Sequence, residues 1–176
     1  AVEEAECDRI MLLPAKMSPF KLEQKIADEK HRIAMVSCVA AEYENVEVST
    51  LEIDGPEVSY TYETMKKIQE KRPEDDLHFI MGSDSLLTLE SWYMGEELLR
   101  DFSFILAPRP GYDSTKTKEK KNAVKKKYGT EIRVLHNKLR DISSTEIKET
   151  IKAGKEIGHL VPTKVAEYIH EHGLYL

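Results

Sequence analysis

The sequence predicts an α/β fold, with a doubly wound, mostly parallel sheet and helices on both faces. Short apolar runs bounded by Pro, Gly or charged residues alternate with longer segments whose apolar residues recur at helical spacing. The run at residues 10–13 is apolar throughout, as expected for a strand buried on both faces of a parallel sheet. The alternation continues without a Ser/Gly linker or an internal repeat, which favours a single domain over residues 1–176.

The expected strands are short and end at recognisable residues. The first stops at Pro14, the third ends in Gly82, and the fourth stops at Pro108. The second begins with the alternating Val46, Val48 and Thr50 and is extended by an apolar pair to residue 53. The predicted strands cover residues 10–13, 46–53, 78–81, 102–107 and 132–135.

The helix boundaries follow from capping residues. Ser59 or Thr61 is expected to cap one helix, and Pro73 follows its end. Ser143 stands three residues before a glutamate, which is the capping-box pattern. The last helix has Pro in its first turn and Gly just after its end. The predicted helices cover residues 28–43, 59–71, a short segment from 96, 114–128, 144–153 and 162–172.

Composition argues against several classes of protein. The formal net charge of −6 argues against nonspecific nucleic-acid binding, and the charged run 116–127 is interpreted as a solvated helix face. No apolar run approaches membrane-spanning length and no signal peptide is visible, so we expect a cytoplasmic protein without membrane partners. Cys7 and Cys38 form no CxxC pair and have no His at metal spacing. They are expected to be buried thiols, and no protein metal site is predicted.

Four loops that follow predicted strands carry groups that suit a nucleotide. Ligands of open parallel sheets bind beyond the carboxyl ends of the strands, where these loops meet. The loops contribute two lysines, a Gly with a carboxylate, an Arg-Pro-Gly turn, and hydroxyls at a helix start, where free N–H groups favour phosphate. They cover residues 14–21, 82–85, 108–112 and 142–145. For the last loop, the simpler interpretation is that Ser143 only caps its helix.

On these residues the sequence resembles the bacterial nicotinate-nucleotide adenylyltransferases, Rossmann-like enzymes of the HxGH nucleotidyltransferase superfamily. The matching strings occur in family order and at family spacing across nearly the whole chain. They are Ser-Tyr-Thr-Tyr-Glu-Thr at 59–64, Phe-Ile-Met-Gly-Ser-Asp-Ser-Leu at 79–86, Trp-Tyr at 92–93, Arg-Pro-Gly at 109–111, Ile-Ser-Ser-Thr at 142–145, and the ending from Val161 to His-Gly-Leu-Tyr at 172–175.

The resemblance implies adenylyl transfer from ATP, which carries Mg²⁺, to nicotinate mononucleotide, giving nicotinate adenine dinucleotide and pyrophosphate. No covalent intermediate is expected. For ATP, the resemblance implies contacts from Lys21, Gly82, Asp84, Ser143, Ser144, Thr145 and Lys148. For nicotinate mononucleotide, it implies contacts from Thr61, Trp92, Arg109 and Tyr112.

The sequence departs from the family pattern in three places. The family opens with a strand and a GGxFDPxHxGH turn whose histidines contact the ATP phosphates, and the chain contains no HxGH. We therefore expect that this N-terminal segment is absent from the sequence. Because the family's HxGH is missing, no catalytic residue is predicted among residues 1–176. Lys148 stands where the family more often has Arg, and it could instead point to solvent. Phe20 stands where the family often has His.

Several alternatives remain open. The lack of HxGH favours a catalytically silent nucleotide-binding fragment, and related adenylyltransferases use nicotinamide mononucleotide or phosphopantetheine instead. Trp92 could be a packing aromatic rather than a ligand contact. The expected partners are the two small-molecule substrates. Self-association is compatible with the sequence, which does not indicate its symmetry.

Overall fold

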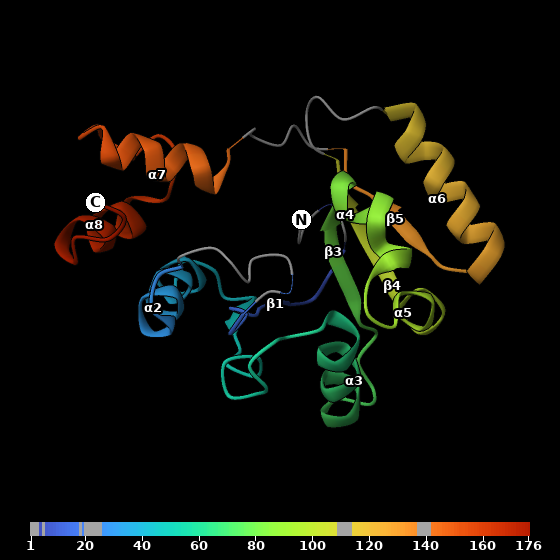
Figure 1. Ribbon diagram of the computed structural model, residues 1–176. Coiled ribbons are helices and arrows are strands. Elements are labelled where there is room, and N and C mark those ends of the chain that lie inside the picture. Colours follow the sequence, from blue (N-terminus) through green and yellow to red (C-terminus); the bar gives the residue numbers. More distant parts are fainter. Residues whose placement is uncertain (1–3, 5, 18, 20–25, 109–113, 137–141) are drawn as a thin grey trace. The chain divides into compact units, whose positions relative to one another are not determined.

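The computed structural model describes residues 4, 6–17, 19, 26–108, 114–136 and 142–176. The chain divides into two compact units, and each is described by itself. The first comprises Ala1–Cys7 with Tyr60–Asp141, and the second comprises Asp8–Ser59 with Ile142–Leu176. Figure 1 shows the strands and helices of both units in the colours of the sequence.

The first unit is built on a parallel sheet. Its strands are β3 (His78–Gly82), β4 (Ser103–Ala107) and β5 (Ile132–Val134), in the order β3-β4-β5. In the central strand β4, Phe104 and Leu106 belong to one core cluster and Ile105 to another. Successive side chains of a strand point to opposite faces, so both faces of this sheet are covered.

The helices of the first unit complete its larger core. They are α3 (Thr61–Lys71), α4 (Ser83–Thr88), the 3₁₀ helix η1 (Leu89–Ser91), α5 (Gly95–Asp101) and α6 (Ser114–Tyr128). The fully buried side chains in this core are Leu86, Leu89, Leu98, Leu99, Phe104, Leu106 and Val124. This core fixes α4, η1 and α5 directly after β3.

The second unit is smaller in strand content. β1 (Ile10–Leu12) pairs in parallel with β2 (Val46–Val48), and α2 (Glu29–Ala40) connects them. α7 (Ser144–Lys152) and α8 (Thr163–Glu171) follow at the end of the chain. Their core contains Ile151, Ile157, Val165 and Ile169, with side chains of α2 packed against it. This core packs α2 against helices from the end of the chain, although they lie far apart in the sequence.

The α/β class with parallel strands is confirmed, and most elements lie within a few residues of their predicted ranges. Asp28 caps α2 through the Lys30 N–H, and Gly173 follows α8 with a positive φ of 56°. The predicted single domain over 1–176 stays a prediction.

Four predictions of local structure were wrong. β2 ends at Val48, because Thr50 donates to the Asp54 carboxylate at 2.7 Å and their backbones close a turn. β1 is half-buried rather than buried on both faces. The N-cap position of α3 is occupied by Tyr60 without a side-chain cap. Residues 82–85 form no loop, since α4 begins directly after Gly82.

Two global expectations concern the thiols and the membrane. Cys7 and Cys38 are not joined in a disulfide, and both are half-buried rather than buried. Within the part of the chain that the structure describes, no helix is long and apolar enough to cross a bilayer.

Candidate functional site

The predicted site residues fall into three groups. Gly82, Asp84, Thr61 and Trp92 lie in the first unit. The second unit holds the hydroxyl cluster Ser143, Ser144 and Thr145 together with Lys148. Lys21, Arg109 and Tyr112 lie outside the described residues, so their contacts stay predictions.

Gly82 and Asp84 are brought together at the carboxyl end of β3. A Cβ atom added at Gly82 would lie 2.6 Å from Asp84 Oδ1, closer than real contacts allow. The glycine therefore leaves the space that the carboxylate occupies. Asp84 is exposed, and its two oxygens can accept hydrogen bonds from the hydroxyls of a ribose. Sequence reasoning paired these residues, and the structure gives the steric reason for the pair.

The start of α3 lies beside the segment that carries the Trp-Tyr pair. The rings of Tyr60 and Tyr93 have centroids 4.5 Å apart and are tilted by 36°. Thr61 is the first residue of α3, where backbone N–H groups lack partners within the helix. Two parts of the predicted nicotinate site are thus joined by an aromatic contact between their neighbours.

Trp92 is half-buried and anchored on one side. Its ring meets the Phe79 ring edge-on with centroids 6.2 Å apart, and its Nε1–H donates to Thr88 Oγ1 at 3.2 Å. It packs against the core of the first unit. The structure therefore supports the packing role of Trp92, while its contact with a ligand stays a prediction.

In the second unit, Ser143 has the predicted capping role. Its Oγ accepts a hydrogen bond from the Glu146 N–H at 3.1 Å. Ser144 and Thr145 are exposed in the first turn of α7. Hydroxyls and free N–H groups at a helix start are the donors that bind phosphate. The cap is confirmed, and phosphate binding stays a prediction.

Lys148 lies four residues after Ser144 and thus on the same face of α7. Its Nζ lies 5.5 Å from the centre of the Tyr175 ring, and the side chain is half-buried. This cation–π contact holds the ammonium near the helix rather than in open solvent. Burial raises the pKa of the Tyr175 hydroxyl, so the ring carries no charge at neutral pH.

Arg32 of α2 was not singled out from the sequence. Its guanidinium donates to the carbonyls of Ala15, Lys16 and Ala27, at 3.1 Å for the last two. These carbonyls flank the predicted Lys21 segment on both sides. A single Arg within a helical pattern gives no signal in the sequence that its side chain binds backbone carbonyls.

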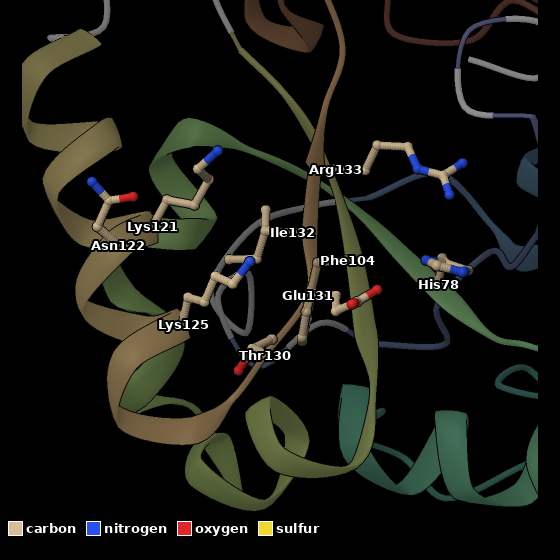
Figure 2. Close-up of a pocket in the computed structure, with 9 residues that line it drawn as sticks. All are labelled: His78, Phe104, Lys121, Asn122, Lys125, Thr130, Glu131, Ile132 and Arg133. Atoms are coloured by element: carbon tan, nitrogen blue, oxygen red, sulfur yellow. The ribbon is translucent and has the colours of Figure 1, made fainter.

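A cavity of about 300 Å³ lies at the opposite end of the strands of the first unit. It involves residues at the start of β3 and β5, and none of the predicted site residues lines it. Figure 2 shows Lys121 and Lys125 on one side of the strands and His78 and Arg133 on the other. The basic groups do not converge, so this cavity is not the candidate site. No cluster of three metal-ligating side chains occurs among the described residues.

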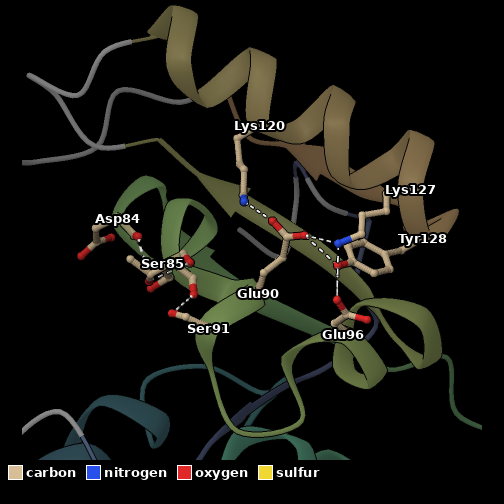
Figure 3. Close-up of polar contacts among 9 residues, drawn as sticks. Asp84, Ser85, Glu90, Ser91, Glu96, Lys120, Lys127 and Tyr128 are labelled. Carbon is tan, nitrogen blue, oxygen red and sulfur yellow. Dashed lines mark hydrogen bonds and ion pairs between the residues drawn. The ribbon is translucent and has the colours of Figure 1, made fainter.

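Sequence reasoning also missed a carboxylate close to Trp92. Glu90 in η1 accepts hydrogen bonds from Tyr128 at 2.7 Å and Lys127 at 3.1 Å, and it forms an ion pair with Lys120 (Figure 3). The hydrogen bond from Lys120, followed by those from Tyr128 and Lys127, lowers the pKa of Glu90 to about 2. The run 116–127 is therefore not simply a solvated face, because two of its lysines bind acidic side chains.

Comparison with known proteins decides the family. The Cytidylyltransferase-like family model matches residues 1–150. A Thermoanaerobacter protein named "Probable nicotinate-nucleotide adenylyltransferase" is 35% identical, with 98% of this chain and 82% of the relative covered. A Clostridium botulinum (strain Kyoto / Type A2) protein of the same name is 34% identical, with 99% and 88% covered. The chain belongs to the nicotinate-nucleotide adenylyltransferase family.

Solved structures give the same fold. The nicotinic acid mononucleotide adenylyltransferase of Plasmodium falciparum, complexed with NaAD, has a TM-score of 0.73 and 19% identity, covering 96% of this chain and 82% of that one. The same enzyme complexed with APC has a TM-score of 0.72 and 18% identity. These structures confirm the Rossmann-like fold, and the relatives above confirm the family resemblance found in the sequence. The nicotinate-nucleotide adenylyltransferases are nucleotidyltransferases, so the chain belongs to an enzyme family.

Proposed function

We propose that this protein transfers the adenylyl group of ATP to nicotinate mononucleotide, forming nicotinate adenine dinucleotide and pyrophosphate in NAD biosynthesis. The observation that carries the proposal is 35% identity to a nicotinate-nucleotide adenylyltransferase over 98% of the chain. A phosphate oxygen of the mononucleotide attacks the α-phosphorus of ATP, the α–β phosphoanhydride bond breaks, and pyrophosphate leaves. Mg²⁺ enters with ATP as part of the substrate. Such transfers depend on positioning and charge stabilisation rather than on a protein nucleophile.

ATP would contact Asp84, the hydroxyl residues at the start of α7 and two lysines. The Asp84 carboxylate, held over Gly82, would accept hydrogen bonds from the ribose hydroxyls. Ser143, Ser144 and Thr145 would donate to the phosphates at the start of α7. Lys148 and Lys21 would neutralise part of the triphosphate charge.

For nicotinate mononucleotide, the proposal places the pyridine ring on Trp92. The backbone N–H groups at Thr61 would bind the carboxylate, since a helix start favours an anion. Arg109 and Tyr112 would complete this subsite. The contact between Tyr60 and Tyr93 supports the arrangement, because it keeps α3 beside the Trp92 segment.

The proposal is tested by incubating the full chain with ATP, Mg²⁺ and one acceptor at a time, then identifying the product by mass. The acceptors are nicotinate mononucleotide, nicotinamide mononucleotide and phosphopantetheine. Formation of nicotinate adenine dinucleotide as the main product is expected. A preference for either other acceptor would replace the substrate assignment, and absence of product with all three would favour the silent nucleotide-binding module.

A cytoplasmic location and self-association stay predictions. Fractionation of the producing cells and sedimentation of the purified chain would test them separately.

A further inference from the structure

The segment that carries Trp92 is a tight turn in the first unit. Leu89 is fully buried, and its carbonyl accepts a hydrogen bond from the Trp92 N–H at 3.1 Å. The Gly95 N–H donates in turn to the Trp92 carbonyl at 2.9 Å. Backbone hydrogen bonds thus define the path from η1 through Trp92 to α5.

The turn has a strained backbone at one residue and a close backbone approach at the next. Met94 has a φ of 52°, in the left-handed region that non-glycine residues rarely adopt. A Cβ added at Gly95 would lie 2.3 Å from the Leu89 carbonyl oxygen and 3.0 Å from that of Glu90. A backbone path of this kind persists only where surrounding contacts hold it.

Glu90 supplies such a contact across to α6. Its two oxygens meet different donors: Oε2 pairs with Lys120, while Oε1 lies 2.7 Å from the Tyr128 hydroxyl and 3.1 Å from Lys127 Nζ. Figure 3 shows these side chains reaching from α6 to the carboxylate. The side chain of Glu90 is 31% exposed and that of Lys120 is 23% exposed, so solvent screens the pair only in part.

α6, which supplies these donors, is itself packed into the core of the first unit. α6 contributes Val124, which is 1% exposed, to the core that also contains Leu89. Tyr128 packs against this core through its ring. A carboxylate that accepts charge-assisted hydrogen bonds from such a helix is well fixed in position.

We propose that Glu90 is a positioning residue for nicotinate mononucleotide, which ties the Trp92 turn to α6 and so fixes the aromatic surface that receives the pyridine ring. The inference rests on the proposed function, because it uses the assignment of the ring to Trp92. Glu90 is two residues from Trp92 and acts through it, without contacting the substrate. Preorganised binding groups lower the cost of ordering on binding, so a loosened Trp92 turn should weaken the binding of nicotinate mononucleotide.

The test uses Glu90→Ala, with Glu119→Ala as the matched control, because Glu119 is an exposed carboxylate of α6 that lies outside the network. In Glu90→Ala we expect the KM for nicotinate mononucleotide to rise about tenfold, with kcat and the KM for ATP changed less than about twofold, because only the binding surface for the pyridine ring is loosened. Lys120→Ala should give the same pattern from the other end of the contact, and Glu119→Ala should match the wild type. Glu90→Gln, which keeps an oxygen acceptor without the charge, should lie between wild type and Glu90→Ala.

A spectroscopic measurement tests the physical link without turnover. Trp92 is the only tryptophan, so fluorescence excited selectively at tryptophan rather than tyrosine reports on this turn. We expect acrylamide to quench Trp92 more strongly in Glu90→Ala than in Glu119→Ala, and the affinity for nicotinate mononucleotide, titrated by the same signal, to fall about tenfold.

The outcomes separate this inference from the proposed function. A wild type that binds nicotinate mononucleotide but forms no dinucleotide contradicts the proposed reaction, while the comparison of variants still tests Glu90. Unchanged quenching in Glu90→Ala, or increased quenching with unchanged affinity, would overturn the positioning role. An equal rise in the KM of both substrates, with a fall in kcat, would also overturn it, since that pattern indicates general loosening of the fold.

Discussion

At the residue scale, the close approach of Gly82 and Asp84 makes a sharp prediction for ATP binding. Gly82→Ala places a methyl group 2.6 Å from Asp84 Oδ1, and the flexible carboxylate is expected to move rather than the backbone. We expect the fold to be retained and the KM for ATP to rise about tenfold, because hydrogen bonds to a charged group are lost. Steady-state kinetics with ATP varied would measure this rise.

Asp84→Asn is the companion variant for Gly82→Ala. It keeps the shape of the side chain but removes its charge and one acceptor oxygen. A KM for ATP that is unchanged in both variants would contradict the ribose contact assigned to Asp84.

A second prediction at this scale concerns the neighbours Met94 and Gly95. Gly95→Ala directs a Cβ at the Leu89 carbonyl, a backbone atom that cannot move aside cheaply. We expect a loss of about 2 kcal/mol in the free energy of unfolding. Met94→Gly relieves the positive φ and should change it by less than about 1 kcal/mol in either direction, since glycine also loses more entropy on folding. Urea denaturation of the two variants would test the pair, and equal stability of Gly95→Ala and wild type would refute the close approach.

These residue-scale features were only partly predictable from the sequence. The Gly-x-Asp pair was singled out because it follows a strand, and the structure adds the steric reason. The role of Glu90 was not predicted, because its partner Lys120 lies 30 residues away in the sequence. A pairwise contact over such a distance depends on how α6 packs, which no local pattern determines.

At the element scale, Ser143 allows the two interpretations of the start of α7 to be separated. Ser143→Ala removes the hydrogen bond to the Glu146 N–H and should lower the free energy of unfolding by about 1 kcal/mol. Ser143→Asp retains a good N-cap but places a negative charge where a phosphate would bind. We therefore expect stability near that of wild type in Ser143→Asp, with an ATP affinity reduced about tenfold or more. Calorimetric unfolding and ATP titration would measure the two quantities.

Ser143→Asn controls for the shape of the Ser143→Asp side chain, since it caps without charge. Equal ATP affinity in the Asp and Asn variants would show that α7 only needs its cap and binds no phosphate.

The contact between η1 and α6 predicts a dependence of stability on pH. The pKa of Glu90 is about 2 in the folded protein, against an ordinary value of 4.5, because Lys120, Tyr128 and Lys127 hydrogen-bond the carboxylate. A lowered pKa means that this stabilisation is fully present above pH 4.5 and is lost as the pH falls toward 2. The stability difference between wild type and Glu90→Gln should therefore shrink between these two pH values. A difference that stays constant across this range, measured by denaturation at each pH, would contradict the network.

Element boundaries could be predicted where the signal was local. Asp28, Ser143 and Gly173 mark helix ends as their residue types suggest. The extended strand over 46–53 was wrong because apolar alternation continued past Val48, whereas the hydrogen bonds between Thr50 and Asp54 close a turn there. The cap of α3 was also wrong. Ser59 and Thr61 are residue types that favour the N-cap, but α3 begins at Thr61, which leaves Tyr60 at the N-cap position.

At the scale of the whole molecule, the predicted site residues are distributed over both compact units. Gly82, Asp84, Thr61 and Trp92 belong to the first, while the α7 hydroxyls and Lys148 belong to the second. The family resemblance predicted site residues in both units, because the family motifs that contain them occur along nearly the whole sequence. Periodicity alone gave only the alternation of strands and helices. Ligand roles depend on groups brought together in space, so sequence patterns named the residues without their contacts.

Adenylyl transfer with nicotinate mononucleotide as acceptor is the activity proposed for the whole molecule. The most direct measurement is the ratio of kcat/KM for nicotinate mononucleotide to that for nicotinamide mononucleotide, followed as pyrophosphate release from MgATP. We expect a ratio of about 10–100 in favour of the nicotinate substrate, since a carboxylate gains charge-assisted hydrogen bonds at a helix start that an amide lacks. A ratio near or below one, or no pyrophosphate release with either acceptor, would contradict it.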